Sequence, residues 1–388
     1  MFDGPDYELA WPREVLVNEA QSLIAIGHES NAGRVEFLLE EAFVSSVPKE
    51  EFLALPKFAQ KASSFDDPWE IATPNASRGS KPALQLDQST YLERLIKSAE
   101  TLREATNPLP YWNERKGAPS PAPSAVNPEA AKRRFATLLS ELDSSGYLDR
   151  IFPRICVDDR YGEEVDRAAK LEELSGIPGL WPIQPTSWDD DTFFTTIEVF
   201  HDLVARPRER SWHSWDECGW HYSAFSVKPA RNLYTIRVNR ILENASIQLR
   251  LATAGENAGR LVHLVDDDRR VLLDRALRSP EPKVRDHIEH ATNLFRRRTA
   301  TAHDKRSAVV TLAHVLESRR KLLKQELLSR DEGALFQIAN EFAIRHESER
   351  QKADYDPLFL DWIFWWYLAT IELTDRLVVR TSQPDCST

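Results

Sequence analysis

The sequence predicts a mainly α-helical, multi-domain protein with a small α+β middle region and a C-terminal antiparallel helical bundle. Three observations lead to this prediction. Apolar residues recur at helical spacing through most of the 388 residues. A proline-rich stretch at 107–128 interrupts that pattern. Two short alternating segments, at 247–252 and 260–265, flank a glycine-containing loop, which is typical of a β-hairpin.

Residues 1–106 form the first expected region, which is helical. Pro12 suits a first helical turn, and Leu16, Ala20 and Leu23 follow one helix face after it. Further helices are expected over 34–43, from Ser46 as a cap, and over 88–105. The next segment, 107–128, contains six prolines and is predicted to be a linker between domains.

Residues 129–268 form the mixed α+β middle domain. Helices are expected over 129–145, 192–204 and 233–244, because their apolar residues recur every three or four positions. The intervening stretch 205–232 is rich in aromatic residues. It shows neither the periodicity of a helix nor that of a strand, so an irregular structure is expected there. The predicted hairpin follows the last of these helices.

Residues 269–388 form the expected C-terminal bundle, whose helices are joined by short connections. The segment Lys352–Pro357 should end one helix before an uncharged run, Trp362–Ile371, which contains five aromatic residues. A run of this length and composition is expected to be a buried core helix, because it is too short and too closely bracketed by acidic residues to span a membrane.

The net charge of −11 conceals an uneven distribution. Residues 269–330 hold 16 basic and 7 acidic side chains, and Arg296, Arg297 and Arg298 are consecutive. These three arginines are therefore candidates for binding RNA or another phosphate group. The alternative is that they solvate the outer face of a helix or pair with the acidic part of the chain. The three cysteines are widely separated and the N-terminus lacks an apolar signal segment, so a cytoplasmic location is expected.

The first catalytic candidate is the adjacent pair Arg345 and His346. A histidine can exchange a proton near neutral pH, and an arginine can stabilise the negative charge on a phosphate. Together they could support cleavage of RNA without a metal ion. Adjacent helical positions point about 100° apart, however, so the two need not converge within one subunit. The alternative is a helix C-terminus at which both side chains interact with the helix dipole and with Glu341.

Arg285 and His290 form the alternative catalytic pair. They match the pattern Arg-x4-His within one predicted helix. Matches of this kind are frequent in arginine-rich segments, so an ordinary solvated helix face remains the alternative.

The helical C-terminal third, about 280–380, resembles a HEPN-type domain, and the stretch 336–370 also resembles C-terminal segments of abortive-infection proteins. The resemblance implies a four- to five-helix bundle that dimerises and cuts RNA without a metal ion, through an Arg-x4-6-His motif at the dimer groove. The chain departs from that pattern. Arg345 and His346 have no residues between them, and the correctly spaced Arg285 and His290 lie in a different helix. A non-catalytic relative is therefore also consistent with the resemblance.

The third candidate is a cluster of possible metal ligands, His213, Cys218 and His221. The Cys-x2-His spacing is one that zinc uses, and His213 is close in sequence. A second closely spaced pair of zinc ligands is missing, because His201 falls on the preceding predicted helix. The neighbouring tryptophans favour packing onto a core, and stacking on nucleic-acid bases is a further alternative. No cofactor is expected, because the sequence lacks a phosphate-binding loop and a dinucleotide-binding motif.

These observations favour an RNA-directed module of a prokaryotic defence or toxin system, with metal-independent endoribonuclease activity as the candidate reaction. In that reaction His346 would be the acid–base group and Arg345 the phosphate clamp. The rival hypothesis is a non-catalytic interaction or sensor protein that forms a homodimer, or binds another protein, through its aromatic C-terminal helix. No membrane partner is expected.

Overall fold

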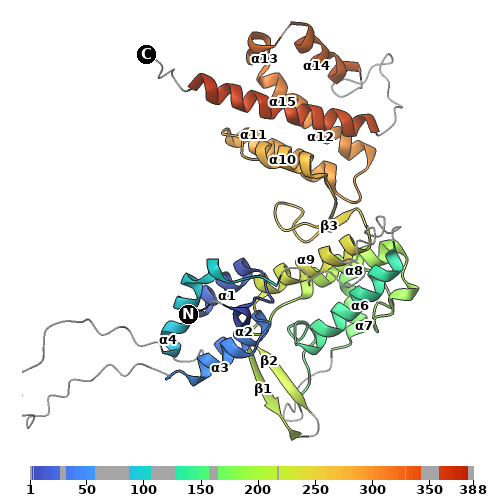
Figure 1. Ribbon diagram of the computed structural model, residues 1–388. Coiled ribbons are helices and arrows are strands. Elements are labelled where there is room, and N and C mark those ends of the chain that lie inside the picture. Colours follow the sequence, from blue (N-terminus) through green and yellow to red (C-terminus); the bar gives the residue numbers. More distant parts are fainter. Residues whose placement is uncertain are drawn as a thin grey trace, which may run out of the picture. The chain divides into compact units, whose positions relative to one another are not determined.

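The computed structural model (Figure 1) describes most of the chain. The described residues are 2, 4–26, 32–56, 87–105, 127–156, 165–215, 218–327, 329–341 and 358–382. They are mainly helical with two short antiparallel hairpins, which confirms the predicted fold class. None of the described helices combines the length and the apolar character needed to cross a membrane.

The chain divides into two units. Met1–Ala125 and Lys132–Arg237 form the first unit, and Val126–Ala131 and Val238–Thr388 form the second. These two units differ from the three regions expected from the sequence. The boundaries of those three regions stay a prediction. The linker predicted at 107–128 lies, up to residue 126, outside the described residues.

The first unit holds the N-terminal helices and the β1–β2 hairpin. Its elements are η1 (Pro5–Tyr7), α1 (Arg13–Ile26), α2 (Ala32–Ala42), α3 (Val47–Ala54), α4 (Gln88–Lys97), η2 (Ala99–Thr101), most of α6 (Pro128–Ser144), α7 (Arg167–Ser175), η3 (Pro185–Ser187), α8 (Asp190–Leu203), β1 (Glu209–His213), β2 (Gly219–Ser223) and the first part of α9 (Val227–Asn244). The apolar faces of α1, α2 and α4 meet in one core around Leu16, Leu38 and Tyr91, which are at most 1% exposed. Helical periodicity therefore predicted these helices, although the helix expected over 88–105 ends at Lys97 and is followed by η2.

The cap of α3 differs from the prediction. The Ser46 hydroxyl does not cap the helix and instead donates to a carboxylate oxygen of Glu50 at 2.7 Å. Ser45 accepts from the backbone N–H of Val47 at 3.1 Å. The expectation of a Ser46 cap was wrong because the backbone of Ser46 is itself in the helical region, whereas a capping residue is usually extended.

The second unit holds the C-terminal helices and the second hairpin. Its elements are the end of α9, β3 (Leu249–Leu251), β4 (Leu261–His263), α10 (Asp267–Ala276), α11 (Pro282–Arg296), α12 (Ala302–Ser318), α13 (Arg320–Glu326), α14 (Ser329–Glu341) and α15 (Leu358–Ser382). Helices α10, α11, α12 and α15 share one apolar core, and α15 packs against α10 and α12 (Figure 1).

The aromatic run of α15 lies mostly inside this core, as predicted. Phe364, Tyr367 and Ile371 are at most 1% exposed, and the ring of Phe364 stacks on Phe295 of α11 with centroids 4.0 Å apart. Trp362 is the exception, with about half of its surface exposed. The helix therefore stabilises the second unit mainly by burying its aromatic face.

Candidate metal centre

The segment that was expected to be irregular, 205–232, contains the β1–β2 hairpin. Its register pairs Ser211 with His221, Trp212 with Trp220, and His213 with Gly219. Because side chains alternate between the two faces of a strand, the two histidines lie on one face and the two tryptophans on the other. The hairpin was missed because its strands are short and half-exposed, and therefore lack an alternating apolar pattern.

The histidine face of the hairpin meets Cys156, which follows the last turn after α6. Sγ of Cys156 lies 3.3 Å from Nδ1 of His213, and Sγ of Cys218 lies 3.0 Å from Nε2 of His221. One ligand atom from each of these four residues lies within 4.8 Å of every other. All four side chains are half-buried. The structure thus joins the three predicted ligands with a fourth that the sequence analysis did not include.

Two cysteines and two histidines form one of the usual ligand sets of a structural zinc site. Zn²⁺ prefers tetrahedral coordination, with bonds of about 2.3 Å to thiolates and about 2.0–2.1 Å to imidazoles. A set of four protein ligands leaves no open position for a substrate or an activated water molecule. The donor set and its convergence therefore fit a zinc ion that stabilises structure rather than one that performs chemistry.

His201 does not belong to this cluster. It lies buried on α8, where Nδ1 is 3.1 Å from a carboxylate oxygen of Asp202 and the ring contacts Tyr234 edge-on. The sequence predicts His201 on the helix before the hairpin, and this is confirmed. Cys156 could not be identified from spacing, because it precedes His213 by 57 residues.

Ion pairs anchor the hairpin to α2. Arg210 forms two hydrogen bonds with the carboxylate of Glu40, at 3.0 and 2.8 Å, and Arg34 lies 2.7 Å from Glu209. The Arg210 hydrogen bonds, ahead of those from Lys49, lower the pKa of Glu40. The hairpin is therefore held at its base independently of any metal ion.

A buried charge cluster lies where the chain enters β1. The guanidinium of Arg206 is inaccessible to solvent and contacts Glu41 at 2.7 Å and Glu19 at 3.1 Å. Arg208 donates to both carboxylate oxygens of Glu19, at 2.7 and 2.8 Å. Burial of the Glu41 carboxyl raises its pKa despite the neighbouring Arg206. Arg206, Arg208 and Arg210 are thus all bound to carboxylates, which argues against their use as phosphate contacts for a base-stacking surface.

The opposite face of the hairpin carries exposed tryptophans. Trp212 and Trp215 are 59% and 75% exposed, and Trp220 is 37% exposed. The rings of Trp212 and Trp220 meet edge-to-face with centroids 5.2 Å apart, and the Arg210 guanidinium lies 4.6 Å from the Trp220 centroid. The packing of these tryptophans into a core, which was the favoured alternative from sequence, is therefore not observed for Trp212 and Trp215.

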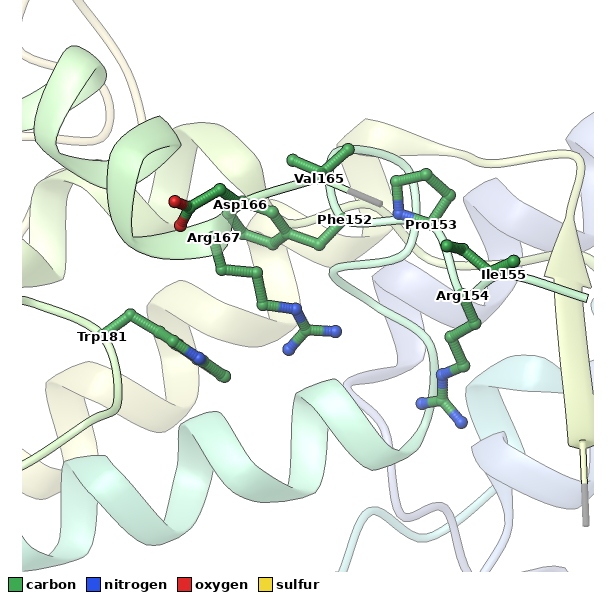
Figure 2. Close-up of a pocket in the computed structure, with 8 residues that line it drawn as sticks. All are labelled: Phe152, Pro153, Arg154, Ile155, Val165, Asp166, Arg167 and Trp181. Atoms are coloured by element: carbon green, nitrogen blue, oxygen red, sulfur yellow. The ribbon is translucent and has the colours of Figure 1, made fainter. Parts of the chain in front are cut away.

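An open pocket of about 750 Å³ adjoins the segment that leads to Cys156 (Figure 2). Its lining residues are Phe152, Pro153, Arg154, Ile155, Val165, Asp166, Arg167 and Trp181. Arg167 lies 4.8 Å from the Trp181 centroid and donates to both carboxylate oxygens of Asp143, at 3.0 and 2.9 Å. Arg154 lies 3.2 Å from Asp149. Because both guanidiniums already contact carboxylates, the pocket offers no clear preference for an anion.

The predicted catalytic residues are only partly described. Arg345 and His346 lie outside the described residues. Arg285 and His290 are both exposed on α11, five positions apart. Five positions correspond to about 140° around a helix, so these two side chains point in different directions from one subunit.

The predicted phosphate-binding arginines lie at the C-terminal end of α11. Arg296 is half-buried and donates to the carbonyl oxygen of His263 at 3.1 Å. Arg297 is exposed and forms an isolated bridge with Val262 of β4. Arg298 is half-buried. The three consecutive arginines therefore flank the β3–β4 hairpin instead of sharing one solvent-exposed helix face.

Comparison with known proteins identified no relative of this chain. No protein-family model matches the chain, and neither a curated protein nor a solved structure is significantly similar to it. The support for a metal site therefore comes from the geometry and chemistry of Cys156, His213, Cys218 and His221.

Proposed function

We propose that this is a zinc-binding protein in which one structural Zn²⁺ ion ties the β1–β2 hairpin to the segment before residue 157. The proposal is carried by the convergence of Cys156, His213, Cys218 and His221, whose ligand atoms lie within 4.8 Å of one another. The ion would hold the histidine face in place and so orient the tryptophan face for contact with another molecule. The role is structural because four protein ligands close the coordination shell.

The metal content of the purified protein tests this proposal. Protein prepared under reducing conditions should contain about one zinc per chain. Replacing the zinc with Co²⁺ should give the visible absorption of a tetrahedral site with thiolate ligands. Cys156→Ser and Cys218→Ser should each reduce zinc retention by at least tenfold, since a thiolate ligand is lost.

Cys386→Ser is the matched control, because it removes the remaining cysteine of the chain and should keep the zinc content unchanged. A disulfide between Cys156 and Cys218 is the rival use of the same thiols. It would appear as a mass two units below that of the reduced chain, together with absent zinc, and this result would exclude the proposal.

A second candidate function is RNA binding and cleavage by the C-terminal unit. It is supported by the excess of basic over acidic side chains between 269 and 330, and by the exposure of Arg285 and His290 on α11. In this reaction the RNA 2′-hydroxyl loses its proton to a histidine and its oxygen bonds to the adjacent phosphorus. The bond from phosphorus to the 5′-oxygen breaks, and that oxygen receives a proton.

An RNA cleavage assay tests the second candidate. Total RNA and a tRNA pool would be incubated with zinc-loaded protein, without any other divalent cation. His346→Ala and His290→Ala would be assayed beside the wild type. Loss of cleavage in one variant with an unchanged melting temperature would identify the acid–base residue. Cleavage that survives both substitutions would exclude both pairs, and no cleavage by the wild type would favour the interaction-protein hypothesis.

A further inference from the structure

The β3–β4 hairpin and the α11–α12 connection bring cationic side chains together in the second unit. Val262 of β4 bridges to Arg297, and Arg296 donates from a terminal guanidinium nitrogen to the carbonyl oxygen of His263 at 3.1 Å. These contacts hold the end of α11 beside β4. The contact between β4 and the end of α11 is a tertiary contact, because the two segments are separated by more than thirty residues.

Arg250 of β3 pairs with Val262 in the register of the hairpin, and Val262 bridges to Arg297, the neighbour of Arg296. The side chains of Arg250 and Arg296 are half-buried, and the Nε atom of each is inaccessible to solvent and lacks a hydrogen-bond partner among the described residues. Burial, and then the charge of Arg250, lower the pKa of Arg296, while the carboxylate of Asp274 partly offsets this. Two like charges thus influence each other at this junction, an arrangement that an added anion would stabilise.

Lys305 of α12 and the His263 ring extend the cluster. Partial burial lowers the pKa of His263, and Lys305, Arg296 and Arg298 lower it further, against a hydrogen bond to the Arg298 backbone. The Lys305 ammonium lies 5.2 Å from the Phe295 centroid. Cations from α11, from the residues just after it and from α12 therefore act on one imidazole.

Two acidic side chains, Asp304 and Asp274, act on the arginines of this junction. Asp304 forms the capping box of α12 with Thr301, accepting its backbone N–H at 2.9 Å and its hydroxyl at 2.7 Å. Asp274 lies on α10 and influences Arg296. Among the described residues, neither carboxylate forms an ion pair with Arg250, Arg296 or Lys305. The local excess of positive charge is therefore substantial.

We propose that this junction is a phosphate-binding site, formed by Arg250, Arg296 and Lys305 beside His263. Guanidinium groups bind phosphate oxygens through two parallel hydrogen bonds, and an ammonium group adds a point charge. The phosphate could belong to a nucleic-acid backbone or be free. The proposal depends neither on zinc binding nor on RNA cleavage, so it can hold if either of those fails.

Binding measurements on the full-length chain test the site. Calorimetric titrations with inorganic phosphate, and fluorescence titrations with a labelled single-stranded RNA of about 20 nucleotides, would be run on the wild type and on Arg250→Gln, Arg296→Gln and Lys305→Gln. Each substitution should weaken binding by roughly tenfold or more, as expected for the loss of a charge-assisted hydrogen bond. Arg278→Gln is the matched control, because Arg278 is an exposed arginine of the same unit.

The two titrations distinguish the source of the phosphate. Tight binding of RNA that weakens steeply with salt, with little affinity for inorganic phosphate, would identify a nucleic-acid backbone as the ligand. Saturable binding of inorganic phosphate would identify a free phosphate. In either case the His263 pKa, followed by NMR, should rise on binding because the anion favours the protonated imidazole.

Three results would overturn the proposal. These are no binding of either ligand, binding that persists in all three variants, and binding lost equally in Arg278→Gln. Far-ultraviolet circular dichroism would show whether each variant is folded. If Arg296→Gln fails to fold because Arg296 also contacts β4, then Arg250→Gln and Lys305→Gln decide the question.

Discussion

Sγ of Cys156 lies 3.3 Å from Nδ1 of His213, although 57 residues separate them in the chain. This contact closes a loop between the end of the α6 region and the first strand of the hairpin. A metal ion bound at this point would stabilise the folded chain, because the four ligands converge only in the folded state. Stability should therefore depend on metal.

Removal of zinc should lower the melting temperature. A ligand that binds only the folded state at a thousand times its dissociation constant stabilises that state by about 4 kcal/mol. Differential scanning calorimetry with and without a chelator should show this loss in the wild type and in Cys386→Ser. Cys218→Ser should melt at one temperature in both conditions. An unchanged wild-type melting temperature after verified loss of zinc would contradict the prediction.

Arg319 should be essential to the second unit. Its guanidinium is buried and contacts Asp375 at 2.7 Å and the Thr374 hydroxyl at 2.7 Å. Arg319→Ala would leave the Asp375 carboxylate buried without its cation, which should cost about 3–5 kcal/mol in urea unfolding. The control is Arg376→Ala, since the Arg376 side chain is exposed where it pairs with Glu372 on the same helix, and it should cost less than about 1 kcal/mol. Equal effects of the two substitutions would refute this assignment.

Gly146 should not tolerate a side chain. Its φ angle is +77°, and a Cβ atom there would overlap the ring of Tyr222 in β2. Gly146→Ala should therefore be destabilising by more than the roughly 1–2 kcal/mol of a left-handed conformation alone. Gly176→Ala is the matched control, because Gly176 has a φ angle of +70° and open space around its Cβ position. The free energies of unfolding of the two variants are measured by chemical denaturation. Gly176→Ala should lower this free energy less than Gly146→Ala does.

The stability of the second unit should fall in mild acid because of His263. Partial burial and the cations Lys305, Arg296 and Arg298 lower the pKa of His263 from its usual 6.5. The unfolded chain therefore binds more protons than the folded one below pH 6.5, and stability is lost as the pH falls through that window. His263→Asn should lose less stability than the wild type between pH 8 and pH 5.5. A larger loss of stability in the variant than in the wild type, measured by thermal melting, would contradict this prediction.

Much of the helical architecture follows from sequence periodicity. Apolar residues at helical spacing predicted α1, α2, α6 and α8, and an uncharged aromatic run predicted the buried face of α15. These predictions succeed because burying an apolar helix face dominates local stability, whatever it packs against. The Ser46 cap failed because capping depends on backbone angles that composition does not determine.

Tertiary structure alone decided the candidate sites. His213, Cys218 and His221 are visible as neighbours in the sequence, but Cys156 joins them only because the hairpin folds back against the segment after α6. Arg250 likewise meets Arg296 through the pairing of β4 with the end of α11. Helix periodicity is a local property that the sequence carries by itself. Coordination and charge clusters need side chains from distant segments, so the path of the folded chain decides them.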